Sequence, residues 1–230
     1  MRHIFVDSRD RVSGTSCDFQ IQLPETLSLE TGHKMRIESL RIPLVIPTID
    51  ATNNTIVVLL GSTSYILTIP QANYSGITIA SVIQGLLNAT APGSWSVVYD
   101  VNNIAMSISC SNPFTITGGT YAADLMAHPY TQTSNSYSFT YVNMLGLDVC
   151  YLCSSKFQTL DLVGPGGSHD TLMACNVTEP YGSVQEFSMG TFSWIDVPRL
   201  VTQSLDFQLR DRYYSVLTMV PNISFVLIID

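Results

Sequence analysis

CDFQIQL at residues 17–23 and SLDFQLR at residues 204–210 are the two stretches that decide the fold. In each stretch apolar and polar residues alternate, which is the pattern of a β-strand with one buried face. Turn-forming residues bound both stretches. Because the two stretches lie far apart in the sequence, we expect them to be strands of one sheet whose halves are separated by a long insert.

The composition is that of a globular protein with an unusually uncharged surface. The chain has 230 residues, of which 46% are hydrophobic, and this is enough for one domain or two small ones. Only 12% of the residues are charged, about half the usual share of ~25%. Such a surface indicates that neighbouring molecules cover large areas of it.

The net charge of −8 argues against a protein whose main role is to bind nucleic acid, because phosphate contacts need clustered Lys and Arg. Arginines do gather near the two ends of the chain. We interpret them as local ion pairs or as contacts between subunits. They are Arg2, Arg9, Arg11, Arg210 and Arg212.

The apolar runs are too short for a membrane span. The longest candidate, residues 224–229, falls well below the ~20 residues that a helix needs to cross a bilayer. Asp7 directly follows the short apolar stretch at the N-terminus, so a signal peptide is not predicted. We therefore expect a chain that is not secreted through a signal peptide and has no membrane span.

The cysteines are odd in number and irregular in spacing, which predicts buried free thiols. They are Cys17, Cys110, Cys150, Cys153 and Cys175. Cys150 and Cys153 form a CxxC that could be a redox pair or half a zinc site. The surrounding pattern indicates a strand, however, in which positions three apart face opposite sides. Cys175 and His169 are only a loose match to the rest of a zinc site, so no metal or cofactor is predicted.

Enzyme signatures are weak. The four histidines are scattered, and the HExxH and GxSxG motifs are absent. The stretch GPGGSHD at residues 164–170 places Ser, His and Asp side by side, but a catalytic triad is assembled in space and neighbours in sequence rarely have its geometry. We predict a loop there and assign no catalytic residue. An enzyme that uses Cys150, Cys153 and Cys175 is kept as a third hypothesis.

Residues 48–145 have a different pattern, which predicts a strand, strand, helix, strand, strand module. The helix is expected within residues 74–88, with Ser75 or Thr78 as its N-cap. Its apolar face is formed by Ile79, Val82, Ile83, Leu86 and Leu87. The hairpin after the helix is expected to turn at residues 101–103, where two asparagines tolerate positive φ.

Short strands resume after the insert, and the predicted fold is a mainly β, single jelly-roll sandwich of about eight strands with the inserted α+β module. The expected strands are residues 17–23, 33–43, 147–153, 170–178, 183–188, 192–197, 203–210 and 222–229, and residues 3–6 are a further candidate. The predicted parts are 1–47, the first part of the jelly roll with an N-terminal arm, then 48–145, the insert, and 146–230, the second part.

Aromatic residues alternate with polar ones before residue 145, at Tyr130, Tyr137 and Tyr141. Such tyrosines offer large contact area at low entropic cost, so they are candidates for a surface that binds sugar or protein. The same alternation is typical of one more strand of the insert. The sequence leaves both interpretations open.

Four segments together resemble the penton-like single jelly-roll minor capsid proteins of eukaryotic double-stranded DNA viruses, a group that includes Polinton, adintovirus and virophage-like viruses and their relatives. The segments are VDSRDRVSGTSCDF at 6–19, GHKMRIESLRIP at 32–43, YILTIPQANY at 65–74 and SLDFQLRD at 204–211. Where that family often has a Gly-containing turn after the last segment, this chain has RYYS at 212–215.

The resemblance implies a structural virion protein rather than an enzyme. It implies a homopentamer at icosahedral vertices, beside a double jelly-roll major capsid protein and other minor capsid proteins, with no direct role in binding nucleic acid. The alternative is a carbohydrate- or receptor-binding β-sandwich, because a jelly roll by itself does not determine function.

Overall fold

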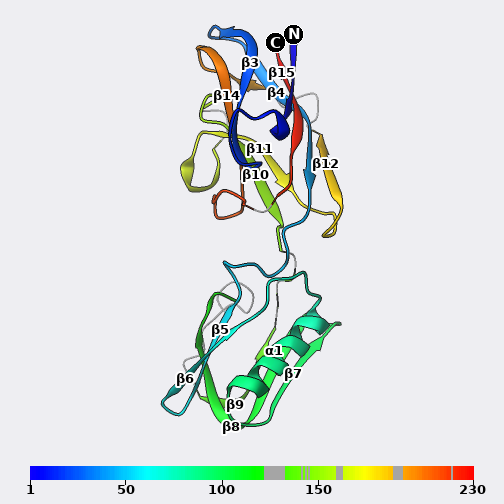
Figure 1. Ribbon diagram of the computed structural model, residues 1–230, viewed down its shortest axis with the longest axis vertical. Helices are drawn as coiled ribbons and strands as arrows, with labels where there is room; N and C mark the ends of the chain where they lie inside the picture. The colour runs from blue at the N-terminus through cyan, green and yellow to red at the C-terminus, as the bar shows by residue number, and fades with distance from the viewer. Residues whose placement is uncertain are drawn as a thin grey trace. The chain divides into compact units, whose positions relative to one another are not determined.

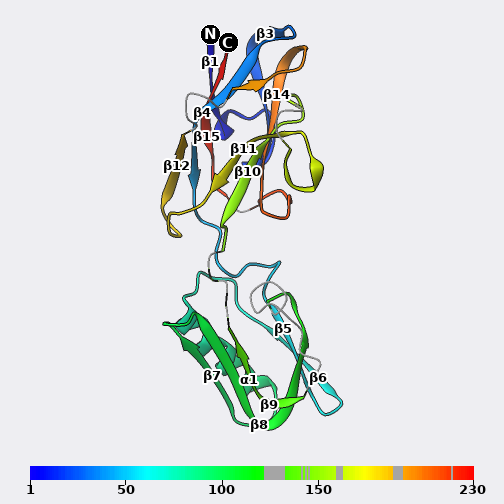
Figure 2. The same cartoon turned by 180° about the vertical axis from the view of Figure 1, so that it is seen from behind.

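The computed structural model describes residues 1–121, 133–140, 142, 144, 146–158, 163–188, 194–218 and 220–230. The chain forms two compact units. One unit combines Met1–Ile46 with Leu147–Asp230, and the other is Pro47–Gly146. The first, the sandwich unit, consists of packed strands, and the second, the inserted unit, carries the helix (Figures 1 and 2). Each unit has its own hydrophobic core.

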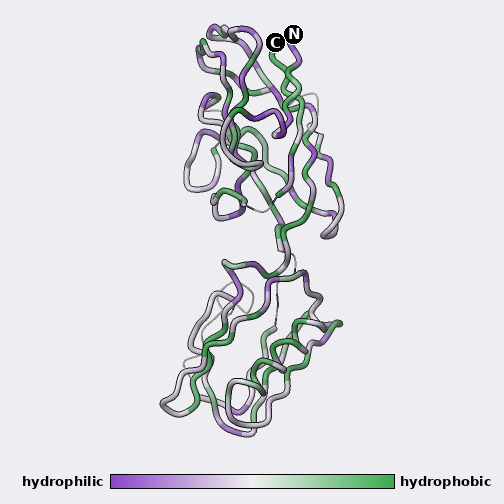
Figure 3. The backbone as a smooth tube through the Cα atoms, viewed as in Figure 1, coloured by the Kyte–Doolittle hydropathy of each residue, from purple (hydrophilic) through white to green (hydrophobic). Residues whose placement is uncertain are grey.

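The first sheet of the sandwich unit has the strand order β1-β15-β4-β12, and β13 also pairs with β4. All its pairings are antiparallel. Its last strand in the chain, β15, is hydrophobic over most of its length (Figure 3). The strands are β1 (Arg2–Asp7), β4 (Lys34–Pro43), β12 (Val184–Ser188), β13 (Ile195–Asp196) and β15 (Ser224–Ile229).

The second sheet has the order β11-β10-β14-β3-β2 and is also antiparallel. Two short 3₁₀ helices lie in the connections of this unit. The strands are β2 (Ser13–Gly14), β3 (Asp18–Leu29), β10 (Val149–Cys153), β11 (Thr171–Asn176) and β14 (Leu200–Arg210), and the 3₁₀ helices are η1 (Ser8–Asp10) and η2 (Pro165–Gly167).

The order of the strands is that of a jelly roll. If the eight longer strands are counted along the chain, the first sheet reads 1-8-3-6 and the second reads 2-7-4-5. Each strand is thus followed by one in the other sheet, except that the fourth and fifth, β10 and β11, pair with each other, as in an eight-stranded jelly roll built from two Greek keys. The predicted mainly β, jelly-roll fold is confirmed. The inserted unit enters between the third and fourth of these strands, β4 and β10.

The two stretches that opened the sequence analysis pair directly with each other. In the β3–β14 ladder Phe19 lies opposite Phe207 and Ile21 lies opposite Leu205. All four side chains are buried, and the Phe19 and Phe207 rings are 5.8 Å apart. Phe207 also packs against Phe225 of the other sheet, with ring centroids 4.8 Å apart. A large apolar side chain contributes about 1.5–3 kcal/mol when it is fully buried. The pairing of β3 with β14 therefore forms a central part of the core.

One expectation about the strands is confirmed and one requires correction. The further candidate at residues 3–6 is a strand, β1, which pairs along its whole length with β15, so this part of the expected N-terminal arm belongs to the sandwich. The segment 192–197 contributes only the two-residue strand β13, and residues 189–193 lie outside the described part of the chain. The eighth strand of the sandwich is therefore β1, whose apolar centre, Ile4 to Val6, is short but sufficient for an edge strand.

The inserted unit has the predicted order of strand, strand, helix, strand, strand, followed by one further strand. Its sheet reads β6-β5-β8-β7, with β9 paired to β8. The long β8 pairs with β7 and β9 along its first half and with β5 near its end. The elements are β5 (Thr55–Leu60), β6 (Thr63–Thr68), α1 (Gly76–Thr90), β7 (Trp95–Asp100), β8 (Ala105–Gly118) and β9 (Ser134–Phe139).

Helix α1 begins where the sequence predicts. Ser75 is the N-cap, and its side chain accepts a hydrogen bond from the Thr78 backbone while the Thr78 side chain accepts one from the Ser75 backbone. This reciprocal arrangement is a capping box formed by Thr in place of the usual Glu or Gln. Ile79, Ile83 and Leu87 on the apolar face are buried.

The hairpin between β7 and β8 differs from expectation at one residue. Neither Asn102 nor Asn103 has positive φ; Ile104 does, with φ of 53°. The left-handed conformation is costly for a β-branched residue. The Ile104 carbonyl accepts a hydrogen bond from Val142 N at 3.0 Å, which helps to hold the residue there.

In the described part of the chain, no helix has the length and apolar character to cross a membrane.

Candidate functional site

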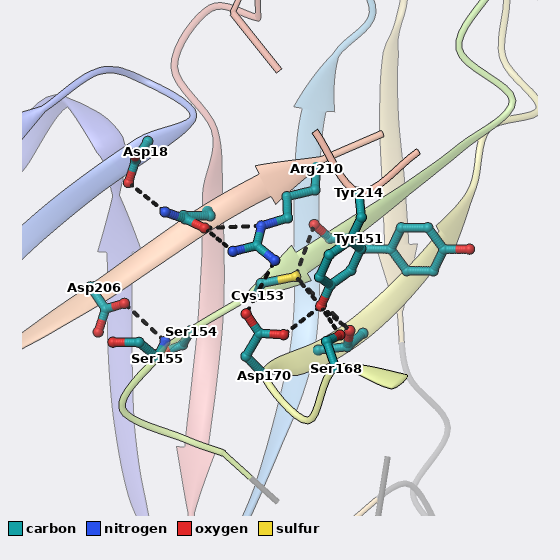
Figure 4. Close-up of polar contacts among 12 residues, drawn as sticks. Asp18, Tyr151, Cys153, Ser154, Ser155, Ser168, Asp170, Asp206, Arg210 and Tyr214 are labelled. Atoms are coloured by element: carbon teal, nitrogen blue, oxygen red, sulfur yellow. Dashed lines mark hydrogen bonds and ion pairs between the residues drawn. The ribbon is translucent and has the colours of Figure 1, made fainter. Parts of the chain in front are cut away.

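In the described part of the sandwich unit, the Tyr214 hydroxyl is a highly connected polar group (Figure 4). It donates to Asp170 Oδ1 at 2.5 Å and accepts from Ser168 Oγ at 2.5 Å and from Cys153 Sγ at 3.3 Å. Thr171 Oγ1 lies 2.7 Å away. These groups come from the end of β10, the start of β11, the loop before it and the turn after β14. The hydroxyl therefore joins four segments, and we call this group the Tyr214 cluster.

Arg210 extends the cluster across the second sheet. Its guanidinium lies 3.2 Å from Asp170 Oδ2 and stacks over the Tyr214 ring at 4.4 Å. It also donates to Gln208 Oε1 through Nε at 3.0 Å, and Gln208 Nε2 donates to Asp18 Oδ1 at 3.1 Å. Only a fifth of the Arg210 side chain is exposed. Arg210, expected at a subunit interface, is thus engaged within its own unit.

The glycine-rich loop before β11 is shaped to bring Ser168 to Tyr214. A Cβ on Gly164 would lie 2.2 Å from Thr171 Oγ1, so a side chain there would displace the cluster. Ser168 and Asp170 both bond to the Tyr214 hydroxyl, whereas His169 Nδ1 is buried without a partner among the described residues. The run Ser-His-Asp is therefore a structural loop and does not have the geometry of a triad.

The turn after β14 holds Tyr214 in a strained conformation. Asp211 Oδ1 accepts hydrogen bonds from the backbone of Tyr213 and Ser215, each at 2.8 Å. Tyr214 has φ of 66°, in the left-handed region that residues other than glycine rarely adopt. The strain is compensated because this conformation brings the hydroxyl to its partners. The stretch RYYS, which departs from the family pattern, thus provides the centre of the cluster.

Apart from the Asp170–Arg210 ion pair, the Tyr214 cluster consists of uncharged groups, which include the protonated Tyr214 hydroxyl and Cys153 thiol. Burial and the hydrogen bond to Asp170 raise the pKa of Tyr214 to about 12. Burial also raises the pKa of the Cys153 thiol. Both groups therefore stay protonated at neutral pH, and neither is activated as a nucleophile. The arrangement is suited to holding segments together.

The predicted free thiols are confirmed, because all five cysteines are free and buried. Cys150 and Cys175 lie opposite each other in the β10–β11 ladder. Their mutual hydrogen bond and burial raise the pKa of Cys150. Cys150 is therefore a poor nucleophile and a poor metal ligand, which counts against the hypothesis of a thiol-dependent enzyme. The described residues contain no group of three potential metal ligands.

The remaining arginines of the prediction each have a partner in their own unit; Arg2, Arg9 and Arg11 are exposed, whereas Arg212 is half-buried. Arg2 pairs with Glu25 at 3.4 Å and Arg212 with Asp148 at 3.1 Å. Arg11 donates to the Ser8 carbonyl at 2.7 Å. Arg9 binds Asp7 at 2.6 Å and lowers the pKa of the Asp7 carboxyl. The ion pairs of Arg2 and Arg9 involve exposed arginines and contribute little to stability, so these two charges can take other partners.

Of the three tyrosines proposed as a binding surface, the structure describes Tyr137 alone. Tyr137 is buried, donates its hydroxyl proton to the Phe114 carbonyl at 2.9 Å and packs edge-on against the Phe114 ring at 4.9 Å. The expectation that Tyr137 forms an exposed binding surface is wrong, because the strand β9 turns its ring into the core. Tyr130 and Tyr141 lie outside the described residues.

The sequence matches no protein-family model and no curated protein. The architecture does match solved structures. The crystal structure of the mavirus penton protein aligns with 100% of this chain and 99% of its own, with a TM-score of 0.53 and 7% identity. The chain has the fold of the mavirus penton protein. A chain from the cryo-EM structure of the Sputnik virophage aligns with 99% of this chain and 97% of its own, at a TM-score of 0.45 and 12% identity. The likeness in fold rests on the mavirus penton protein.

Proposed function

We propose that this protein is a capsid subunit, a penton protein that assembles as a homopentamer and closes the vertices of an icosahedral virion. One observation carries the proposal. A jelly roll with a second unit between its third and fourth strands aligns over its whole length with the mavirus penton protein. The alignment covers both units of the chain, so a protein of another class would have to match the combination of the two units by chance.

The exposed apolar side chains of the sandwich unit support an assembled state. Phe5, Val163 and Val201 are 79%, 66% and 64% exposed. Single exposed apolar residues are ordinary, but here they stand on a surface poor in charge, and interfaces between subunits are depleted in charged residues. Such surfaces are suited to contact with other capsid subunits.

The Tyr214 cluster supports a structural rather than an enzymatic role. Its hydroxyl and thiol remain protonated, and its bonds tie together four segments of one unit. A capsid subunit must keep its conformation when neighbouring subunits bind it, so a cluster that holds four segments together fits the proposed role.

The proposed partners are a double jelly-roll major capsid protein and other minor capsid proteins. The proposed location is the vertex of the virion.

Nothing in the described residues favours the carbohydrate-binding alternative, because Tyr137 is buried in the core of the inserted unit. We therefore propose a single function.

The test is an icosahedral reconstruction of the particles that contain this chain. Particles made with the native chain are compared with particles whose chain carries a small folded tag at its C-terminus. The proposal predicts jelly-roll density at the five-fold axes and extra density for the tag at those positions alone. Tag density at other positions of the shell, or particles that close their vertices without this chain, would contradict it.

A further inference from the structure

The outer edge of β1 carries unpaired backbone groups. The hydrogen bond from Ser8 N to the Ile223 carbonyl, at 2.9 Å, continues the β1–β15 ladder. In an antiparallel ladder hydrogen-bonded residues alternate, so the backbones of Arg2, Ile4 and Val6 face β15. His3, Phe5 and Asp7 direct theirs away from the sheet. Within the described part of the chain, β1 pairs with β15 alone.

The opposite edge of the same sheet, β12, is open in the same way. Leu44 N donates to the Ser183 carbonyl at 2.9 Å, next to the pairing of Val184 with Pro43. By the same alternation the backbones of Gln185 and Phe187 bond to β4. Those of Val184, Glu186 and Ser188 face outward. No described strand lies beyond β12 in this sheet.

Both edges lack three of the features that prevent strands from pairing with other chains. These three are a proline, a bulge and a lysine that faces inward. Neither β1 (RHIFVD) nor β12 (VQEFS) contains a proline or a lysine, and neither ladder has an irregularity. Each edge instead has an exposed apolar residue, Phe5 at 79% exposure and Val184 at 47%.

The directions of the strands make the two edges complementary. The sheet order β1-β15-β4-β12 contains four strands that alternate in direction, so β1 and β12 run opposite ways. Copies related by rotation about an axis parallel to the strands all keep the same orientation. Under such a rotation β12 of one copy meets β1 of the next in antiparallel orientation, which is the head-to-tail contact that a closed ring requires.

The side chains select one register for this contact. With Phe5 opposite Val184, two apolar side chains meet on one face, and two residues further on His3 lies opposite Glu186. In that register the outward backbone groups of Phe5 and Val184 face each other and can exchange both hydrogen bonds. The Glu186 carboxylate already lies 3.0 Å from Arg41 and is 69% exposed, so it has room for a second partner.

We propose that β1 of one copy pairs with β12 of the next copy, Phe5 opposite Val184, so that the first sheet runs continuously around the ring. The occupant of each open edge is thus a second copy of this chain. A hollow of about 390 Å³ lies beside β1 and leaves room for the neighbouring copy. Its lining includes Ile4, Phe5 and Leu23. This inference rests on the homopentamer of the proposed function.

Disulfide trapping tests the register directly. The double variant Phe5→Cys, Val184→Cys is oxidised mildly, and its products are separated on a non-reducing gel. The five native cysteines are at most 6% exposed, so the two new thiols are the ones expected to react. The proposal predicts a ladder of covalent species up to the pentamer for the double variant, and monomer for each single variant.

A second pair of variants examines the backbone contact. Phe5→Pro removes the outward N–H and leaves the ladder to β15 intact, whereas Phe5→Ala keeps that N–H and removes only the ring. We expect the proline variant to lose the pentamer and the alanine variant to weaken it, with circular dichroism unchanged in both.

The outcomes separate this inference from the function on which it rests. A native pentamer whose double variant gives no ladder overturns the edge pairing and leaves the penton proposal standing. Dimers formed by Phe5→Cys alone also overturn it, because they mean that β1 pairs with β1. Absence of any pentamer counts against the penton proposal itself.

Discussion

The Tyr214 hydroxyl donates a hydrogen bond to Asp170 Oδ1 at 2.5 Å and so ties the turn after β14 to the residue just before β11. Asp170 pairs in turn with Arg210, whose guanidinium covers the Tyr214 ring. Tyr214 therefore keeps its strained φ of 66° because several groups hold it there. The cluster thus links the end of β10, the start of β11 and the turn after β14.

Tyr214→Phe is expected to destabilise the sandwich unit. The change leaves the ring in place but removes the one hydroxyl shared by Asp170, Ser168 and Cys153. Since the partly buried side chains of Asp170 and Ser168 lose a hydrogen-bond partner, we expect the free energy of unfolding to fall by about 1–3 kcal/mol. Urea unfolding followed by circular dichroism measures it. Tyr181→Phe, at a half-exposed tyrosine, is the control and should change stability by less than about 0.5 kcal/mol. Equal effects of the two changes would mean that the cluster adds nothing.

The same tyrosine should make stability depend on pH in the alkaline range. Its folded-state pKa is raised to about 12, above the ordinary value of about 10. Between these two pH values the unfolded chain loses the phenolic proton while the folded chain keeps it, so the tyrosine's contribution to stability is complete below pH 10 and declines toward pH 12. The difference in unfolding free energy between the native chain and Tyr214→Phe should therefore shrink over this range. A difference that stays constant would show that the folded pKa is ordinary.

Ile104 is expected to be a site where a substitution stabilises the protein. Its φ of 53° costs a β-branched residue about 1–2 kcal/mol, whereas asparagine tolerates this conformation. Ile104→Asn should raise the free energy of unfolding by about 1 kcal/mol in a denaturant titration. Val101→Asn, in the same turn and without positive φ, is the matched control and should bring no gain. A loss of stability in Ile104→Asn would indicate that the exposed isoleucine makes contacts that outweigh its strain.

The N-cap serine of helix α1 and a serine within the helix should respond to the same substitution with opposite signs. Ser75→Ala removes the cap on the Thr78 N–H and should cost about 0.5–2 kcal/mol. Ser81→Ala, on the exposed side of the helix interior, replaces a weak helix former by the best one and should stabilise slightly. Thermal unfolding of the full chain compares the two. A melting temperature that falls equally in both variants would contradict the capping assignment.

Regular patterns made much of the fold predictable. The alternation at residues 17–23 placed Phe19, Ile21 and Leu23 on one buried face, and the helical spacing of Ile79, Ile83 and Leu87 located α1. Both signals are local, because the side-chain period of a strand or helix is set within a few residues. These periodic patterns can be recognised even in a sequence whose family motifs are short.

The Tyr214 cluster was not predictable in the same way. Cys153, Asp170 and Tyr214 come together only because the jelly roll places β10 between β11 and β14. The one available signal was GPGGSHD, whose glycines indicated a tight loop but not its partner. Likewise the sequence RHIFVD gave no sign that β1 has an open edge, because that property depends on where the strand lies in its sheet.

Native mass spectrometry of the purified full chain tests the central claim most directly. The account predicts a dominant species of about 127 kDa, five times the 25.3 kDa of one chain. It also predicts that this species dissociates on Phe5→Pro substitution. A single species of 25.3 kDa at every concentration up to the solubility limit, or a stable dimer in place of the pentamer, would contradict the account.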